Sequence, residues 1–230
     1  MQLFHVLNRG VDKRKLFLDK QDYLRFVHDL FEFNDAELIN NNKYYFSKSK
    51  IKDIVSPYIG SNKSKKKPRK LLVDIYAFCL MPNHYHLLLS PKVESGISLF
   101  MKKVNIGYAK YFNQKYERQG TLFEGRYKSI SIDNESHFIH IPYYIHLNPL
   151  DLIAPEWRER KLKNYKKAIN FLNSYRWSSH LDYIGKTNFP SVTNRDFLME
   201  FFGGPEKYRK SINDWLKNLN LMNFKEFLLE

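Results

Sequence analysis

Two histidines, His84 and His86, stand two positions apart in an apolar run, with Tyr85 between them. If this run is a β-strand, side chains at i and i+2 point to the same face, so both imidazoles would reach one divalent ion. Neutral imidazole suits transition metals well. Short motifs of this kind also arise by chance, and both histidines would fit core or surface positions. The pair is therefore a candidate metal site that needs support from other residues.

A second candidate segment, residues 143–149, reads Tyr-Tyr-Ile-His-Leu-Asn-Pro. On a helix, Tyr144 and Asn148 lie one turn apart on the same face. The phenol is a nucleophile suited to phosphorus, and the amide oxygen is a metal ligand. An unperturbed tyrosine has a pKa of about 10, so it needs a nearby cation or Lewis acid to react as phenolate. Tyr143 is the neighbouring alternative nucleophile but lacks an amide at i+4, and a core role for both tyrosines is also compatible with the segment.

Basic residues accompany a third segment, residues 120–128, in which Gly120 and Gly125 bracket aromatic and cationic side chains. Such a segment suits close approach of a nucleic acid backbone with a base stacked on a ring. A structural turn that holds an Arg–Glu pair fits the same residues nearly as well. The predicted DNA contacts, here and near the N-terminus, are Arg9, Lys13, Arg14, Arg126 and Lys128.

Charge and composition favour a nucleic acid partner. Lys and Arg number 38 against 24 Asp and Glu, a formal charge of +14, which supports salt-sensitive phosphate contact. The single cysteine, Cys79, excludes an internal disulfide and a cysteine-rich zinc site, and it fits a small core residue in a reducing compartment. No secretory signal or membrane-length apolar run is visible, so we expect a soluble cytoplasmic protein without a membrane partner.

The hydrophobic pattern predicts the elements that must position these residues. Asp19 and Ser95 are the expected N-caps of the first two helices, and Pro149 is expected to halt the third. The predicted order is strand 3–8, helix 20–33, a hairpin of strands 71–80 and 84–90, helix 97–116, a loop and strand within 122–132, and helix 135–147. This order predicts an α+β fold, an antiparallel sheet with helices on one side. Residues 1–155 would form the catalytic domain, with an insertion at about 34–70, and residues 156–230 a mainly helical C-terminal extension.

Four blocks taken together, residues 4–10, 81–88, 120–128 and 144–149, resemble the single-tyrosine HUH transposases in order and spacing. These include insertion-sequence transposases and the branch associated with repetitive extragenic palindromes. The resemblance covers roughly residues 3–153. It implies a ferredoxin-like α+β core with a central antiparallel sheet.

The resemblance also implies roles for individual residues. His84, His86 and Asn148 would bind a divalent metal ion, Mg²⁺ or Mn²⁺, and Tyr144 would be the nucleophile. Family enzymes cut single-stranded DNA near hairpins, keep a 5′-phosphotyrosine link and rejoin strands without ATP. The partner would be single-stranded or hairpin DNA. Whether the chain acts as a monomer or a homodimer stays open, because the tyrosine helix in this family serves either its own subunit or a partner.

Two other functions remain compatible with the sequence. One is a domesticated single-stranded DNA-binding module that keeps the fold without strand transfer. The other is a metal-dependent phosphoesterase that uses the histidine pair alone and hydrolyses its substrate without a tyrosine adduct.

Overall fold

The computed structural model describes residues 1–37 and 69–217 of the chain. Its sheet has four strands, β1 (Phe4–Arg9), β2 (Val73–Met81), β3 (His84–Pro91) and β4 (Lys128–Ser131), in the order β2-β3-β1-β4. All neighbouring strands are antiparallel. Helix α1 (Lys20–Glu32) connects β1 towards β2, and α3 (Gly96–Lys115) connects β3 to β4. This topology is ferredoxin-like, as the family resemblance implied, and it has the antiparallel α+β sheet that the hydrophobic pattern predicted.

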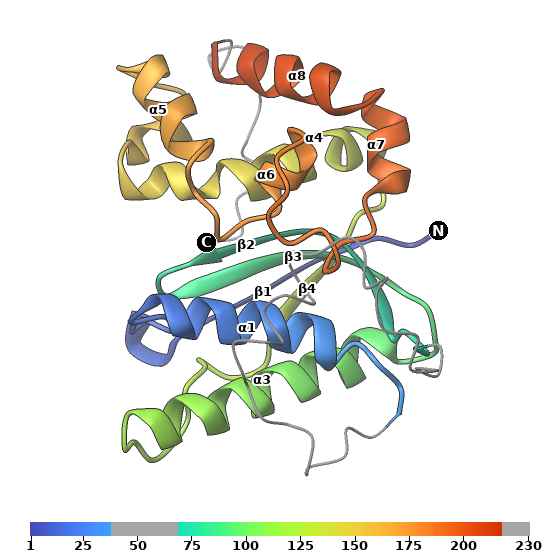
Figure 1. The fold of residues 1–230 in the computed structure, drawn as a ribbon, viewed down its shortest axis with the longest axis vertical. Coiled ribbons are helices and arrows are strands. Elements are labelled where there is room, and N and C mark those ends of the chain that lie inside the picture. Colours follow the sequence, from blue (N-terminus) through green and yellow to red (C-terminus); the bar gives the residue numbers. More distant parts are fainter. Residues whose placement is uncertain (38–68, 218–230) are drawn as a thin grey trace.

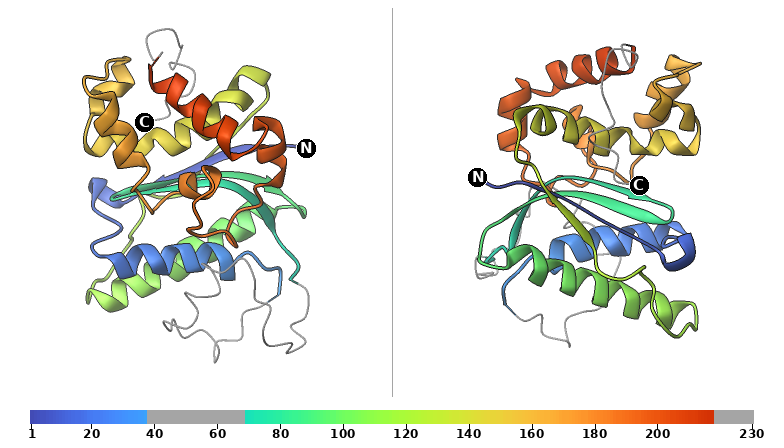
Figure 2. Two further views of the ribbon diagram at one scale, coloured as in Figure 1. Left: turned by 45° about the horizontal axis from the view of Figure 1, so that its top comes forward. Right: turned by 180° about the vertical axis from the view of Figure 1, so that it is seen from behind.

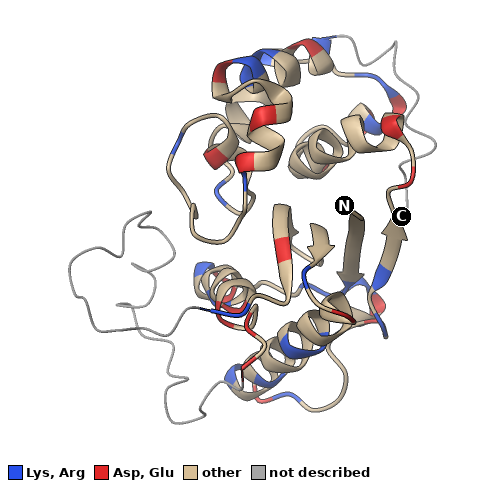
Figure 3. Ribbon diagram, turned by 90° about the vertical axis from the view of Figure 1, so that its right-hand side faces the viewer, with Lys and Arg blue, Asp and Glu red and all other residues tan. Residues whose placement is uncertain are grey.

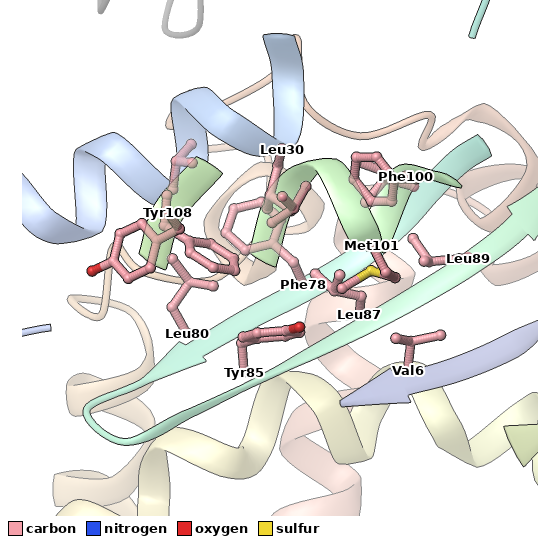
Figure 4. Close-up of a cluster of buried hydrophobic side chains, with 14 of the residues drawn as sticks. Val6, Leu30, Phe78, Leu80, Tyr85, Leu87, Leu89, Phe100, Met101 and Tyr108 are labelled. Atoms are coloured by element: carbon pink, nitrogen blue, oxygen red, sulfur yellow. The ribbon is translucent and has the colours of Figure 1, made fainter. Parts of the chain in front are cut away.

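Helices α1 and α3 cover one face of the sheet (Figure 1). Helix α1 starts as predicted: the Asp19 side chain accepts a hydrogen bond from the Asp22 amide, and the Asp22 carboxylate accepts one from the Asp19 amide in return. Alternate strand residues meet the apolar stripes of both helices in a core that excludes water. Figure 4 shows part of this core, which includes Val6, Leu30, Phe78, Tyr85, Leu87, Phe100 and Tyr108.

Helix α4 (Glu135–Leu147) covers the opposite face of the sheet, so helices lie on both sides rather than on one as predicted. The reason is visible in β2, where the side chains that point to either face of the sheet are apolar and buried. Phe78 and Leu80 pack towards α1 and α3, whereas Ala77 and Cys79 belong to the core under α4. A strand that is apolar on both faces needs cover on both.

The C-terminal part of the chain packs on α4. It contains the short 3₁₀ helices η3 (Asn148–Leu152) and η4 (Pro155–Glu159), followed by α5 (Tyr165–Leu172), α6 (His180–Tyr183), α7 (Asp196–Phe202) and α8 (Pro205–Lys217). Both views of Figure 2 show these helices on the side of the sheet opposite α1 and α3. A helical C-terminal extension is therefore present, and it shares a hydrophobic core with α4. The boundary at residue 155 stays a prediction.

The C-terminal part also covers the free edge of β2. The Leu80 amide donates to the Trp177 carbonyl at 2.8 Å, and the Tyr183 hydroxyl donates to the Tyr76 carbonyl at 2.8 Å. An open strand edge exposes unpaired backbone groups, and these contacts satisfy part of that edge.

Ser95 precedes α3, but it does not cap the helix as predicted. Its backbone is left-handed (φ 56°) and its side chain makes no capping hydrogen bond, because capping requires an extended residue. The predicted insertion at 34–70 falls mostly on residues 38–68, which lie outside the described residues. In the described ranges, no helix is both long and apolar enough to cross a membrane.

Candidate functional site

The histidine pair lies at the start of β3, directly after the tight turn of the β2–β3 hairpin. His84 pairs across the strands with Arg9 on β1 and Met81 on β2, and His86 pairs with Leu7 and Cys79. The two imidazole centroids are 5.0 Å apart. Both rings therefore share one sheet face, as the i, i+2 spacing predicted, and it is the face covered by α4.

Each imidazole is held through its Nδ1 atom. Nδ1 of His84 lies 2.7 Å from the Asn83 side-chain oxygen, and Nδ1 of His86 lies 2.9 Å from Nε2 of His5. His5 and His86 are fully buried, and their rings stack with centroids 5.1 Å apart. Histidines that bind metals commonly have such an outer hydrogen bond, which fixes the ring and its tautomer. Coordination by His84 and His86 would accordingly use Nε2.

Helix α4 places Tyr144 against this pair. The Tyr144 ring is fully buried, and its centroid lies 5.8 Å from that of His86 and 5.9 Å from that of His5, edge to face in both cases. Tyr143 instead stacks on Tyr208 in the C-terminal core, and burial raises the pKa of its hydroxyl, which disfavours the phenolate. The structure brings Tyr144, and not Tyr143, to the histidines.

Asn148 caps the C-terminus of α4 and is fully buried. Its side-chain nitrogen donates to the Tyr144 carbonyl at 2.9 Å, which fixes the amide. Its side-chain oxygen accepts a hydrogen bond at 2.9 Å from Nη2 of Arg158, a residue of η4. Nη1 of the same guanidinium lies 3.1 Å from the Tyr144 hydroxyl. Arg158 thus joins the predicted nucleophile to the predicted third ligand.

Asp151 holds the Arg158 guanidinium in this place. Nε and Nη2 of Arg158 donate to the Asp151 carboxylate at 2.7 to 3.1 Å, and the Trp157 indole donates to the same carboxylate at 2.6 Å. Burial lowers the pKa of Arg158, but hydrogen bonding to Asp151 and the charges of Tyr144 and Asp151 outweigh it, so the net pKa is raised and the group stays cationic.

Sequence reasoning missed His5, Asp151 and Arg158. His5 had a usable signal, because it is a polar residue in an otherwise apolar predicted strand. Asp151 and Arg158 had none, because their connection depends on how the chain turns after Pro149.

The donor chemistry at the histidine pair fits a divalent cation. Two neutral imidazoles and one amide oxygen would leave coordination positions open for water or phosphate oxygen. Within residues 1–37 and 69–217, no three His, Cys, Asp or Glu side chains group at metal-binding distance. Asn148 as the third protein ligand stays a prediction.

Three of the predicted DNA contacts share one small cleft of about 80 Å³ beside the histidines. Lys128 pairs with Leu7 across β1 and β4, on the same sheet face as His86. Backbone hydrogen bonds from Glu124 to Arg9 and from Val11 to Leu122 fix the loop that precedes β4. The cleft is lined by Leu7, Asn8, Arg9, Glu124, Arg126 and Lys128. Glu124 of the 120–128 segment pairs with Arg9 on β1, at 3.5 Å, and so joins this segment to the sheet.

Lys13 and Arg14 lie outside the lining of that cleft, next to the hairpin turn. The Asn83 side chain donates to the Lys13 carbonyl at 3.4 Å, and Gly10 donates to the Asn83 carbonyl at 2.8 Å. Elsewhere the charge is mixed: Figure 3 shows basic and acidic residues on both helical layers. The cleft, rather than the overall charge, therefore marks the candidate DNA surface.

Part of this chain is similar in sequence to a known family of proteins. The family of IS200-like transposases matches residues 38–148, which include β2, β3, α3, β4 and α4. The matched segment contains both histidines and the Tyr144–Asn148 pair, whereas β1 and α1 precede it. No curated protein is significantly similar in sequence. A solved structure described as a REP-associated tyrosine transposase bound to a REP hairpin is 12% identical, with a TM-score of 0.42 over 85% of this chain and 86% of that chain.

A ferredoxin-like sheet with a histidine pair under a tyrosine helix is the arrangement implied for a single-tyrosine transposase. The family match, rather than the structural similarity, carries the assignment. The match of residues 38–148 to the IS200-like transposases supports the resemblance of this chain to the single-tyrosine HUH transposases.

Proposed function

We propose that this transposase is a metal-dependent strand transferase that cleaves and rejoins single-stranded, hairpin-associated DNA through a 5′-phosphotyrosine. The observation that carries the proposal is the position of Tyr144: its ring lies 5.8 Å from that of His86, and its hydroxyl accepts a hydrogen bond from Arg158. A phenol beside two histidines and a cation supports a nucleophilic role for Tyr144 towards phosphate.

In the proposed reaction the Tyr144 hydroxyl oxygen forms a bond to the phosphorus of the scissile phosphodiester. The bond between phosphorus and the 3′ oxygen breaks, and the phenol proton ends on the departing 3′-hydroxyl. The 5′ end stays linked to the tyrosine. Attack by a 3′-hydroxyl reverses these steps, so strands are rejoined without an external energy source.

His84, His86 and Asn148 would hold a divalent ion, Mg²⁺ or Mn²⁺. When bound, such an ion supplies Lewis-acid polarisation of the phosphate and neutralises charge that develops on its oxygens. His5 and Asn83 orient the two imidazoles, and α4 and the C-terminal helices exclude water from the phenol.

The basic cleft would bind the DNA backbone on its way to Tyr144. Arg9 is the cross-strand partner of His84, and Lys128 lies two strands from His86 on the same sheet face. Phosphates bound by Arg9, Arg126 and Lys128 would therefore approach the histidine pair. The hairpin bound by the structurally similar transposase supports a hairpin-associated substrate here. We expect the protein to act on this DNA in the cytoplasm.

The test incubates the full chain with Mn²⁺ and end-labelled single-stranded oligonucleotides that carry hairpins from the surroundings of its gene. A covalent band on a denaturing protein gel is expected for the unchanged protein and for Tyr143→Phe, and no band for Tyr144→Phe or His84→Ala. A band that survives Tyr144→Phe would move the nucleophile elsewhere. Cleavage with no covalent band would favour a phosphoesterase that uses the histidines alone.

The second candidate function is a single-stranded DNA-binding module without strand transfer. The basic cleft supports binding whether or not chemistry follows. Tight, metal-independent binding of oligonucleotides that are neither cut nor linked would favour this function. The same purified protein, run on a sizing column with and without DNA, would show whether it acts as a monomer or a homodimer.

A further inference from the structure

Arg158 makes three kinds of contact within the candidate site. Its guanidinium donates to the Tyr144 hydroxyl, to the Asn148 side-chain oxygen and to the Asp151 carboxylate. The planar guanidinium directs its donors in fixed directions, so one side chain sets the relative positions of all three acceptors. A lysine ammonium has no such fork.

The guanidinium is held firmly before any substrate arrives. The Arg158 side chain is 19% exposed, and its carbon Cζ lies 5.2 Å from the centre of the Trp157 ring. Asp151, which accepts from both Arg158 and Trp157, fixes the opposite side of the group. Ion pairs of low exposure are screened less by water and salt than surface pairs. The donor aimed at Tyr144 is therefore preorganised.

The atom that Arg158 contacts is the atom that would react. In strand cleavage the Tyr144 oxygen becomes a bridging oxygen of the phosphotyrosine, and in rejoining it departs again. A cationic donor on this oxygen stabilises the negative charge that it carries when the bond to phosphorus is partly formed. The same donor acts in both directions, because both pass through the same transition state.

We propose that Arg158 is a catalytic residue of strand cleavage and rejoining, which aims the Tyr144 oxygen and stabilises its charge. This inference rests on the proposed strand-transferase function. The bond changes are those of that reaction, and Arg158 neither gains nor loses a proton. Asp151 is a positioning residue that acts through Arg158.

The experiment measures single-turnover formation of the covalent adduct with the hairpin oligonucleotides and Mn²⁺. Arg158→Ala is expected to slow adduct formation about 100-fold, the effect of removing one preorganised donor in other enzymes. Arg158→Lys keeps the charge and is expected to fall between Arg158→Ala and the unchanged protein. Added methylguanidine is expected to restore part of the Arg158→Ala rate, because it supplies the missing donor.

The matched control is Lys161→Ala, which removes an exposed cation from the same region and is expected to leave the rate unchanged. Rejoining is measured separately, by adding a 3′-hydroxyl strand to adduct isolated from each variant. Arg158→Ala is expected to slow rejoining by a factor similar to that for cleavage. Thermal unfolding and DNA affinity of each variant are recorded in parallel.

Each outcome decides the proposal. Adduct formation by Arg158→Ala at the unchanged rate overturns the role of Arg158 and leaves the strand-transferase function standing. Equal slowing in both Arg158 variants, with no rescue by methylguanidine, assigns Arg158 to packing of η4 and also overturns it. Absence of a Tyr144-dependent adduct in the unchanged protein overturns both the function and the inference.

Discussion

His5 on β1 and His86 on β3 are joined by a buried hydrogen bond of 2.9 Å between Nε2 and Nδ1. Neither ring is exposed, and the two stack face to face. This contact fixes the orientation of the His86 ring beside Tyr144. In the proposed metal site His5 would therefore orient the ligand His86 without binding the ion itself.

The first prediction concerns this outer hydrogen bond. His5→Phe keeps an aromatic ring of similar volume but removes the hydrogen-bonding nitrogen, so the affinity of the protein for Mn²⁺ is expected to fall by about 10- to 100-fold. Isothermal titration with Mn²⁺ measures the change without any DNA. His28→Phe on α1 is the control, because α1 covers the sheet face opposite to α4. Equal Mn²⁺ affinity in His5→Phe would show that His5 does not support a metal ligand.

The second prediction concerns the basic cleft. Each phosphate contact removed from a single-stranded DNA complex lowers the slope of log affinity against log salt by about 0.7. Lys128→Gln is expected to show this reduction and to weaken binding of all sequences to a similar extent. Fluorescence anisotropy between low and moderate salt measures it. Lys102→Gln on α3, which lies on the far side of the sheet, should keep the original slope. An equal reduction of the slope in Lys102→Gln would show that DNA binding depends on nonspecific charge rather than on the cleft.

The third prediction concerns pH and the buried His180. Burial first, and then the positive charge of Lys186, lower the pKa of His180 from 6.5 to about 3. Because the unfolded chain binds this proton more readily, the free energy of unfolding falls as pH decreases from about 6.5 towards 3. The slope from this group is at most about 1.4 kcal/mol per pH unit.

Urea unfolding of the protein at a series of pH values between 7 and 4 checks this prediction. His180→Asn removes the titrating group, so its unfolding free energy should decrease less over the same range. The comparison between variant and unchanged protein cancels the contributions of groups that do not interact with His180. His146 is not among them, because its pKa is lowered by burial first and then by the charge of His180. Parallel pH profiles of the two proteins would contradict the prediction.

The fourth prediction concerns the start of α3. A Cβ atom at Gly96 would overlap the carbonyl oxygen of Leu72, which is backbone and cannot rotate away. Gly96→Ala is expected to destabilise the protein by about 1–3 kcal/mol, as overpacking of a tight contact does. Chemical denaturation measures the loss. At Gly107 the three nearest atoms all belong to the Phe33 side chain, which can move, so Gly107→Ala, which also gains helix propensity, should cost less. A larger loss of stability for Gly107→Ala than for Gly96→Ala would contradict the prediction.

Local patterns in the sequence determined much of the fold. The alternation around His84 and His86 is enough to place both rings on one strand face, because that depends only on the pleat. The Asp19 cap and the apolar spacing that follows it likewise determine α1 within the chain itself. The spacing of Tyr144 and Asn148 needs only a helix, and Pro142 does not interrupt that helix.

Only the tertiary structure decided which groups surround the predicted nucleophile. His5 lies 81 residues from His86 in the chain, and the strand register brings them into contact. Tyr143 and Tyr144 are indistinguishable as side chains and share one hydrophobic core. The packing of α4 between the sheet and the C-terminal helices gives them different neighbours, His86 for Tyr144 and Tyr208 for Tyr143. Arg158 reaches Tyr144 because the chain folds back through η3 and η4. Such contacts depend on non-local packing, for which neighbouring residues carry no periodic signal.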